Sequence, residues 1–259
     1  MHGGRGAVRV VMAIVAVITA GGAVAGCGAG QAPIPVVGKA PADLILDPGG
    51  LPTGFTPSPL TVDQLVAADA ASLKAAANTT IVPEQCRPTA DAALQPQLSG
   101  TDAAVLAATS GTGTLVELVT TAERDIAADV VATTGRCART ETTIVDGNMA
   151  GTRVTTEYTT LDDPDLAEHR DAVERMHLVA SAITTTLPDG GRQSRISYAG
   201  YALVQRPGKN VVTVQLTVSG EPTAATAPDA AAPAARAPMP AEDFVVLFGD
   251  AVRAAADRS

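Results

Sequence analysis

The histidines are the residues of this 259-residue chain best suited to acid–base or metal chemistry. His169 and His177 lie eight residues apart, with Glu168 and Glu174 close by in the sequence. Zinc proteases carry two histidines within H-E-x-x-H, which places both on one helix face. The wider spacing here would need zinc ligands from elsewhere in the chain. We therefore interpret both histidines as solvated side chains on a helix surface and expect no metal site.

Two further patterns fall short of the motifs that they approach. Residues 169–171, His-Arg-Asp, match the catalytic triplet of protein kinases, but Met176 stands where that loop requires asparagine. The carboxylates of Asp162, Asp163 and Asp165 could meet a calcium ion, but the D-x-D-x-D-G spacing and the downstream glutamate are absent. We interpret the first pattern as coincidence and the second as a solvated loop.

No sequence motif marks a catalytic nucleophile. Residues 110–113, Ser-Gly-Thr-Gly, invite a nucleotide-loop interpretation, but Val116 replaces the third glycine of G-x-G-x-x-G, so a hairpin turn is favoured. Neither G-x-S-x-G nor S-x-x-K occurs. We expect a non-enzymatic protein with no catalytic residue and no cofactor. The alternative is a hydrolase with an unmarked serine or threonine, or with two acids that meet only in the fold.

The N-terminal residues indicate export. Arg5 and Arg9 precede an apolar run at 10–18, and small residues follow up to position 26, which is the order of a secretory signal peptide. Residues 24–27, Val-Ala-Gly-Cys, resemble the lipobox of bacterial lipoproteins. The resemblance implies cleavage before Cys27, acylation of Cys27, for example with palmitate, and anchoring at the extracytoplasmic face of the cell membrane. An ordinary secretory signal followed by a chance cysteine is the alternative.

The remaining cysteines, Cys86 and Cys137, are left as a pair in an exported chain, where disulfides persist. We predict that they are bonded. A metal site or a reactive thiol is the alternative, but C-x-x-C spacing and a nearby histidine are both absent from the sequence.

Composition limits the partners. Residues 1–26 hold two basic and no acidic residues, so the rest of the chain carries 16 basic against 27 acidic side chains. This balance argues against nucleic acid and against electrostatic attachment to anionic lipid. With three Phe, three Tyr and no Trp, the chain is also poorly supplied with stacking platforms for sugars or bases.

The elements that would position any site follow from periodicity. Apolar spacing predicts helices at 61–77, 89–95, 122–133 and 241–257, with a polar surface helix at 162–176. Thr61 is the expected N-cap of the first helix, and the third is expected to bury Ile126, Val130 and Val131. Alternation and turn residues predict strands at 103–109, 114–121, 142–145, 151–160, 178–187, 192–204 and 211–219.

Hairpin-linked strands imply an α+β fold in which an antiparallel β-sheet carries amphipathic helices packed on one face. We expect a lipoprotein signal peptide at 1–26, a flexible tether at 27–50 and a single disulfide-stapled domain at 51–258. An Ala/Pro-rich loop at 221–240, expected to be disordered or a long irregular connection, should precede a closing C-terminal helix.

The layout resembles secreted mycobacterial lipoproteins of unknown function, which are loosely similar to the extracellular sensor domain of the receptor kinase PknH. The features that carry the resemblance are Leu-Pro-Thr-Gly-Phe at 51–55, the turn at 83–86, Cys137 after a helix, the late strand pair and the closing helix. The kinase sensor carries two disulfides and this chain can form one, so its cleft is not transferred. The expected function is a sensor-like binding module for an envelope lipid, a small molecule or an exported protein. An envelope lipid carrier is the alternative.

Overall fold

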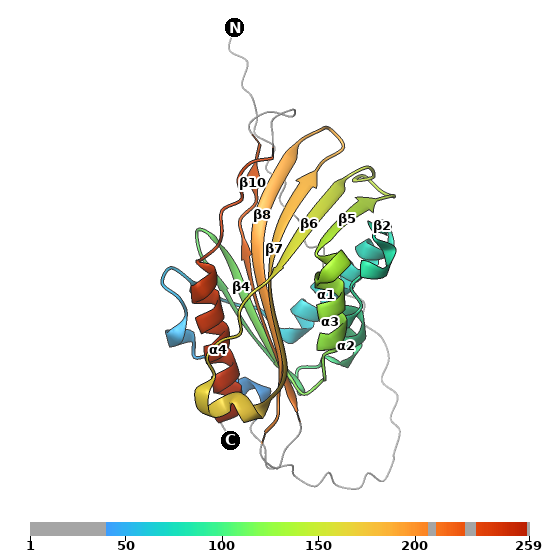
Figure 1. Cartoon of the computed structure of the whole chain (residues 1–259). Coiled ribbons are helices and arrows are strands. Elements are labelled where there is room, and N and C mark those ends of the chain that lie inside the picture. The colour runs from blue at the N-terminus through green and yellow to red at the C-terminus, as the bar shows by residue number, and fades with distance from the viewer. Residues whose placement is uncertain (1–39, 207–210, 226–231, 258–259) are drawn as a thin grey trace, which may run out of the picture. The chain divides into compact units, whose positions relative to one another are not determined.

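The computed structural model describes residues 40–206, 211–225 and 232–257, which belong to one compact unit, Val37–Ser259. The described residues form a ten-stranded antiparallel sheet in the order β1-β3-β4-β9-β8-β7-β6-β5-β2, and the short β10 pairs with the beginning of β8 (Figure 1). The strands are β1 (Thr56–Ser58), β2 (Thr79–Val82), β3 (Ala103–Thr109), β4 (Gly113–Thr120), β5 (Arg139–Ile144), β6 (Arg153–Thr160), β7 (Val173–Thr186), β8 (Arg192–Val204), β9 (Val212–Gly220) and β10 (Thr223–Ala224). The helices are α1 (Val62–Ala77), α2 (Ala90–Leu94), α3 (Ile126–Thr133) and α4 (Ala241–Asp257), with short 3₁₀ turns that include η1 (Pro41–Asp43), η3 (Glu84–Cys86), η5 (Gly135–Cys137) and η6 (Ala167–Ala172).

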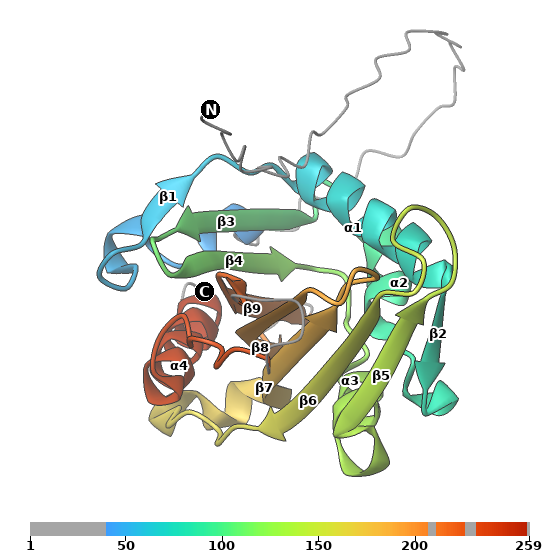
Figure 2. The same ribbon diagram turned by 90° about the horizontal axis from the view of Figure 1, so that it is seen from above.

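The sheet has two faces because side chains alternate along each strand. We name the face that carries Leu115, Val214 and Leu216 the α4 face, since these side chains share a core with α4. The opposite face carries Leu118 and Gln215, and we name it the α1 face. Figure 2 shows α4 on one side of the sheet and α1 on the other.

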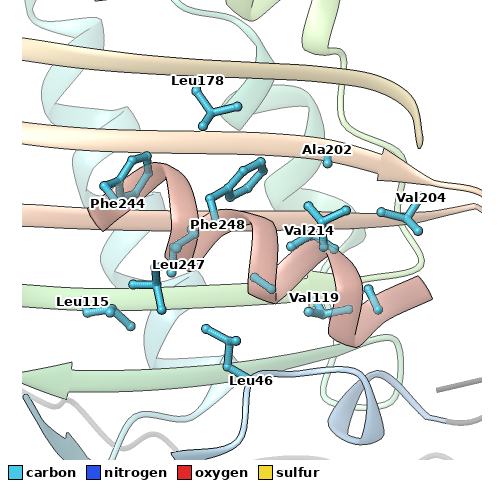
Figure 3. Packing of buried hydrophobic residues seen from close by; sticks show 14 of the residues in the cluster. Leu46, Leu115, Val119, Leu178, Ala202, Val204, Val214, Phe244, Leu247 and Phe248 are labelled. Atoms are coloured by element: carbon cyan, nitrogen blue, oxygen red, sulfur yellow. The ribbon is translucent and has the colours of Figure 1, made fainter. Parts of the chain in front are cut away.

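The main hydrophobic core lies between α4 and the α4 face (Figure 3). Phe244, Leu247, Phe248 and Val252 are all buried. Leu247 and Phe248 follow Phe244 by three and four residues, and Val252 follows Phe248 by four, so these side chains lie on one side of α4. Burying each such side chain is worth about 1.5–3 kcal/mol relative to leaving it exposed. The closing helix at 241–257 therefore has the bounds and the role that its apolar pattern predicts.

Gly200 in β8 allows α4 to approach the sheet closely. A Cβ built on Gly200 would lie 2.6–2.9 Å from three ring carbons of Phe248, well inside ordinary contact distance. Phe248 is fully buried, so its ring has no solvent to move into. The missing side chain of Gly200 is thus a packing requirement at the centre of the core.

The α1 face carries helices of its own. The first turns of α1 bring Val62, Leu65 and Val66 against a small cluster that includes Leu94 of α2 and Leu118 of β4. Thr61 caps α1 as predicted, because its hydroxyl accepts a hydrogen bond from the Gln64 N–H at 3.2 Å and its own N–H donates to Gln64 Oε1 at 2.9 Å.

The expected fold class is confirmed, since the chain is α+β with a large antiparallel sheet and a Cys86–Cys137 disulfide. Helices lie on both faces, however, and not on one face as the hairpin argument predicted. The physical reason is that β4 is apolar on both sides, with Leu115 and Val119 facing α4 and Leu118 facing α1 and α2. No helix in the described ranges is long and apolar enough to span a bilayer.

The ordered domain begins before residue 51. Leu44 is 0% exposed and Leu46 is 7% exposed, and both belong to the core beneath α4. The Leu46 N–H donates a hydrogen bond of 3.0 Å to the buried Glu117 carboxylate. The boundary of the tether at residue 50 is therefore wrong for 40–50, because the apolar run at 44–46 packs although prolines and glycines surround it.

Several other expectations are corrected by the structure. The polar stretch 162–176 contains η6 and the start of β7, since Val173 and Met176 pair with the end of β8 instead of forming a helix. The third helix, α3, begins at Ile126. It buries Ile126 as expected and Ala132, whereas Val130 and Val131 point outward and are 37% and 63% exposed.

The expected irregular loop at 221–240 is packed where the structure describes it, at 221–225 and 232–240. Thr223 and Ala224 form β10, which pairs with β8. Pro238 and Met239 are buried, and the Thr112 hydroxyl donates to the Pro238 carbonyl at 3.1 Å. Residues 226–231 lie outside the described ranges. Of the two alternatives, the described ends fit the long irregular connection, apart from the short strand β10.

Candidate ligand-binding site

A cavity of about 550 Å³ lies on the α1 face, beneath the second half of α1. We call it the α1 cavity. α1 contributes Asp69, Ser72, Leu73, Ala76 and Ala77 to its lining. The second half of the helix is mostly alanine, whose methyl groups are too short to fill the space above the sheet. The first half of α1 packs through Val62 against the small cluster that contains Leu94 and Leu118, and the second half covers the cavity.

Hydroxyl groups form the floor of the α1 cavity. Thr140, Thr156 and Tyr158 of β5 and β6 point to the same face, because Thr140 pairs with Thr156 and Tyr158 lies two residues further along β6. Tyr158 and Thr140 are hydrogen-bonded, and burial raises the pKa of Tyr158 above its ordinary value. The floor can therefore donate and accept hydrogen bonds, whereas Leu73, Ile81 and other apolar side chains line the walls. The remaining lining residues are Thr79, Arg87, Pro88, Asp91, Ala92 and Thr142.

A second cavity of about 230 Å³ adjoins the first and shares Asp69 and Asp91 with it. Its other lining residues include Leu65, Leu94 and Leu118. The two carboxylates thus stand where the two cavities meet. Burial and the neighbouring Asp91 raise the pKa of Asp69 above its ordinary value, although Arg124 acts in the opposite direction.

Arg124 holds Asp91 in place from beneath. Its side chain is 2% exposed, and it binds Asp129 through two hydrogen bonds of 2.7 and 2.8 Å. A third nitrogen, Nη1, donates to Asp91 at 2.8 Å and to Gln215 at 3.0 Å. The guanidinium also lies 4.0 Å from the ring centroid of Tyr201. Arg124 therefore fastens α2 and α3 to the sheet, and these contacts use four of its five N–H donors.

Burial perturbs the ionisation of the whole cluster. Burial opposes the charge of Arg124, but its acidic neighbours, first among them the hydrogen-bonded Asp129, together more than offset this effect and the pKa of Arg124 is raised. Burial raises the pKa of Asp129, against the lowering effect of Arg124. Burial likewise raises the pKa of Tyr201, so this phenol stays neutral beneath the guanidinium.

The other end of the α1 cavity is closed by Arg87. Its guanidinium donates to the carbonyl of Ala76 at 3.2 Å and to the carbonyl of Thr79 at 3.0 Å. These contacts satisfy a carbonyl in the last turn of α1 and join the helix to β2. Arg87 therefore fixes the far end of the cavity roof.

The predicted disulfide joins Cys86 in η3 to Cys137 in η5, with a Cα–Cα distance of 5.4 Å. Cys86 directly precedes Arg87, and the same segment continues into α2, which carries Asp91. The bond thus ties one wall of the α1 cavity to the segment after α3. Cys27, the other residue singled out in the sequence, lies outside the described residues.

The two histidines do not form a site together. His169 lies in η6 and contacts the Asp257 carboxylate of α4, so it belongs to the α4 side of the sheet. His177 lies in β7, is 5% exposed, and its Nε2 is 2.8 Å from the Thr133 hydroxyl of α3. The interpretation of both as solvated helix residues is therefore wrong for His177, because residue 177 belongs to a strand.

The contact between His177 and Thr133 is not the geometry of an activated nucleophile. The Thr133 hydroxyl donates its proton to the Asp129 carbonyl at 2.8 Å. It can then only accept from the imidazole, which makes Nε2–H the donor. Burial lowers the pKa of His177, against the raising effect of Asp129 and Asp163.

The remaining sequence patterns have structural explanations. Residues 110–113 form the hairpin between β3 and β4, with the Ser110 N–H donating to the Gly113 carbonyl at 2.8 Å. Asp162, Asp163 and Asp165 lie before η6, and no cluster of potential metal ligands occurs among the residues described.

The site residues that sequence reasoning missed are Asp69, Asp91 and Arg124. Asp69 could have been noticed, because it stands four residues from both Leu65 and Leu73 and so lies within the apolar stripe of α1.

Comparison with known proteins does not place the chain in a described family. No protein-family model matches it, and no curated protein matches it either. Among solved structures, it is similar to an uncharacterized protein (Rv0999 ortholog) from Mycobacterium smegmatis, with a TM-score of 0.42 and 15% sequence identity. The match covers 82% of this chain and 93% of that one. The lipoprotein and kinase-sensor parts of the expected resemblance stay predictions.

Proposed function

We propose that this chain is a lipid-anchored cell-envelope protein that binds a small molecule in the α1 cavity and performs no chemistry on it. The observation that carries the proposal is the cavity itself. Its volume of about 550 Å³ falls within the range of roughly 300–1,000 Å³ that is typical of ligand pockets. Its lining combines apolar walls with nine polar or charged residues out of fifteen, which could orient a ligand.

The sequence supplies the rest of the proposal. The lipobox at 24–27 would anchor the chain at the extracytoplasmic face through Cys27, and two or three acyl chains suffice for stable attachment. The acidic balance of the chain disfavours nucleic acid as a partner. A cavity beside a membrane anchor would sample molecules of the envelope.

A blocking substitution tests the binding site. Ala76 lines the α1 cavity, so Ala76→Trp should fill part of it. Ala71 is exposed on the opposite side of α1 and does not line the cavity, which makes Ala71→Trp the matched control. We expect native mass spectrometry of freshly extracted protein to show a small-molecule adduct on the wild type and on Ala71→Trp, and to lose it on Ala76→Trp. An equal adduct on Ala76→Trp, or a wild type without any adduct, would contradict the proposal.

An envelope lipid carrier is the alternative within the same site. The apolar side chains of Leu73, Ile81 and Ala92 favour it, whereas the hydroxyl floor and the carboxylates favour a smaller amphipathic ligand. The mass of the adduct distinguishes them, because a lipid would be identified by its acyl composition.

A hydrolase is the second candidate, and the observation that favours it is the convergence of Asp69 and Asp91 at the cavity junction. Two carboxylates can serve as acid and base or nucleophile in glycoside hydrolysis. Asp91 is hydrogen-bonded to Arg124, and both histidines lie outside the cavity lining, which supports binding over catalysis. Turnover of any bound ligand by the wild type, lost in Asp69→Asn with unchanged unfolding, would favour the hydrolase.

A further inference from the structure

The charged groups of the α1 cavity are unevenly distributed along it. Asp69 and Asp91 stand at the junction with the smaller cavity, and Arg87 stands at the opposite end. Asp69 and Ala76, whose carbonyl binds Arg87, are seven residues apart on α1. At 1.5 Å per residue this separation is about 10 Å along the helix axis. The cavity therefore has an anionic end and a cationic end.

The cationic end is already engaged. The Arg87 guanidinium donates to two main-chain carbonyls, those of Ala76 and Thr79, which hold the end of α1 on β2. A ligand that pulled this guanidinium away would break its link between α1 and β2, although the Ala76 carbonyl would still accept a hydrogen bond from the Thr79 hydroxyl at 2.7 Å. Recognition of an anion at Arg87 would thus compete with contacts that shape the cavity.

The anionic end is only partly neutralised. Arg124 gives two hydrogen bonds to Asp129 and one to Asp91. In the described part of the chain no hydrogen bond or ion pair reaches the Asp69 carboxylate, which feels Arg124 and Asp91 only through space. Three carboxylates therefore face one guanidinium, and Asp69 is the acceptor left over. Its pKa is raised by burial and by Asp91, which is the direction expected of a carboxylate without a close cation.

We infer that the α1 cavity selects an organic cation, with an ammonium or guanidinium group bound to Asp69 and an apolar body held beneath α1. This inference rests on the proposed function and adds the chemical class of the ligand. A cation at Asp69 would receive a charge-assisted hydrogen bond in a partly dry site, where such bonds are strongest. The apolar body would contact Leu73, Ala76 and Ile81, and the hydroxyl floor leaves room for additional polar groups.

Three probes with one body and different charges test the inference. Adamantylammonium, adamantanol and adamantane carboxylate share a compact apolar cage and do not form micelles. Each is titrated into the full chain by isothermal titration calorimetry at low ionic strength, because screening by salt weakens exposed electrostatic contacts. We expect the ammonium to bind at least about tenfold more tightly than the alcohol and the carboxylate. This ratio corresponds to the low end of the range for hydrogen bonds to charged groups, as suits the half-buried Asp69.

Substitutions assign that preference to Asp69. Asp69→Asn keeps the shape of the side chain and removes its charge, so the ammonium should lose about tenfold in affinity while the alcohol is unaffected. Asp63→Asn on the same helix is the matched control, because Asp63 is exposed and lines neither cavity. It should leave all three affinities unchanged.

The outcomes separate this inference from the function on which it rests. If the alcohol or the carboxylate binds as tightly as the ammonium and Ala76→Trp blocks all probes, the cavity binds ligands but the cation preference is wrong. If Asp69→Asn leaves the ammonium affinity unchanged, the inference is also wrong. If no probe binds the wild type, the cation inference is wrong, and the adduct test with Ala76→Trp decides the proposed function separately. If Ala76→Trp leaves ammonium binding intact, the cavity is not the site and both proposals fall.

Discussion

The contact between Gly200 and Phe248 yields a prediction whose size follows from the structure. In Gly200→Ala, the new methyl group would lie 2.6 Å from Cδ2, 2.8 Å from Cε2 and 2.9 Å from Cγ of the Phe248 ring. Carbon atoms in contact prefer about 3.5–4.0 Å, so the ring or the helix must shift by roughly 1 Å. Overpacking of this kind costs about 1–3 kcal/mol.

Two effects set the net change in the free energy of unfolding. Replacing glycine by alanine within a strand recovers about 0.5–1 kcal/mol of backbone entropy and propensity. The midpoints of the two ranges differ by about 1 kcal/mol, which is the net loss expected for Gly200→Ala. Phe248→Ala alone should cost about 3–5 kcal/mol, the range for a fully buried phenylalanine. In the double variant the alanine methyl at position 200 enters the space that the ring has left, so the two losses should not add.

Urea unfolding followed by circular dichroism measures all four proteins of this cycle. We expect the double variant to be more stable than the sum predicts by about 1 kcal/mol, beyond the usual error of about 0.5 kcal/mol for independent sites. Gly111→Ala is the control, because a Cβ at Gly111 meets nothing within 4 Å. If Gly200→Ala were as stable as Gly111→Ala, or if the cycle were additive, the steric argument would be refuted.

Four further predictions concern single residues. Cys86→Ser should lower stability by about 2–5 kcal/mol in urea unfolding, because its disulfide closes a loop with a sequence separation of 51 residues; unchanged stability would contradict this. Arg124→Met should cost about 3–5 kcal/mol by the same assay, since it leaves the buried Asp129 carboxylate unpaired, and a neutral effect would remove Arg124 as the fastening residue. Burial lowers the pKa of His177 in the folded state below its ordinary 6.5, so the unfolded chain binds the proton more readily and stability should fall as pH drops below about 6.5. His177→Gln should flatten this part of the pH profile of stability measured in urea. An unchanged profile would mean that another group causes the pH dependence. Cys27→Ala should abolish labelling of the expressed chain by radioactive palmitate, and persistent labelling would contradict the lipobox interpretation.

The regular elements of the core were predictable because their periodicity is strong. The strands at 103–109 and 192–204 and the helix at 241–257 have the predicted bounds. Each strand has a continuous alternation of apolar residues, and the helix has a continuous apolar stripe, as an element with one buried face requires. β1, β2 and β10 were missed because strands of two to four residues carry no measurable period. Their pairing is decided by the neighbouring strands.

The candidate site was predictable only in part. Cys86 and Cys137 follow from export and from the count of cysteines, and they prove to brace one cavity wall. Arg124 gave no signal, because its partners, the exposed Asp91 and the buried Asp129, come from two different helices. The cavity itself arises from what is missing, namely long side chains on the second half of α1. Sequence patterns report apolar groups that are present and do not report volume that stays unfilled.

The position of α4 after all ten strands has a consequence for the order of folding. The helix supplies Phe244 and Phe248 to a core whose other side is formed by β4, β8 and β9. Until residues 241–257 dock, Leu115, Val214 and Leu216 would form a bare apolar sheet surface. Contacts between segments so distant in sequence form slowly, and exposed sheets of this kind aggregate. A chain that emerges N-terminus first would therefore depend on a chaperone, or on delayed collapse, until α4 is available.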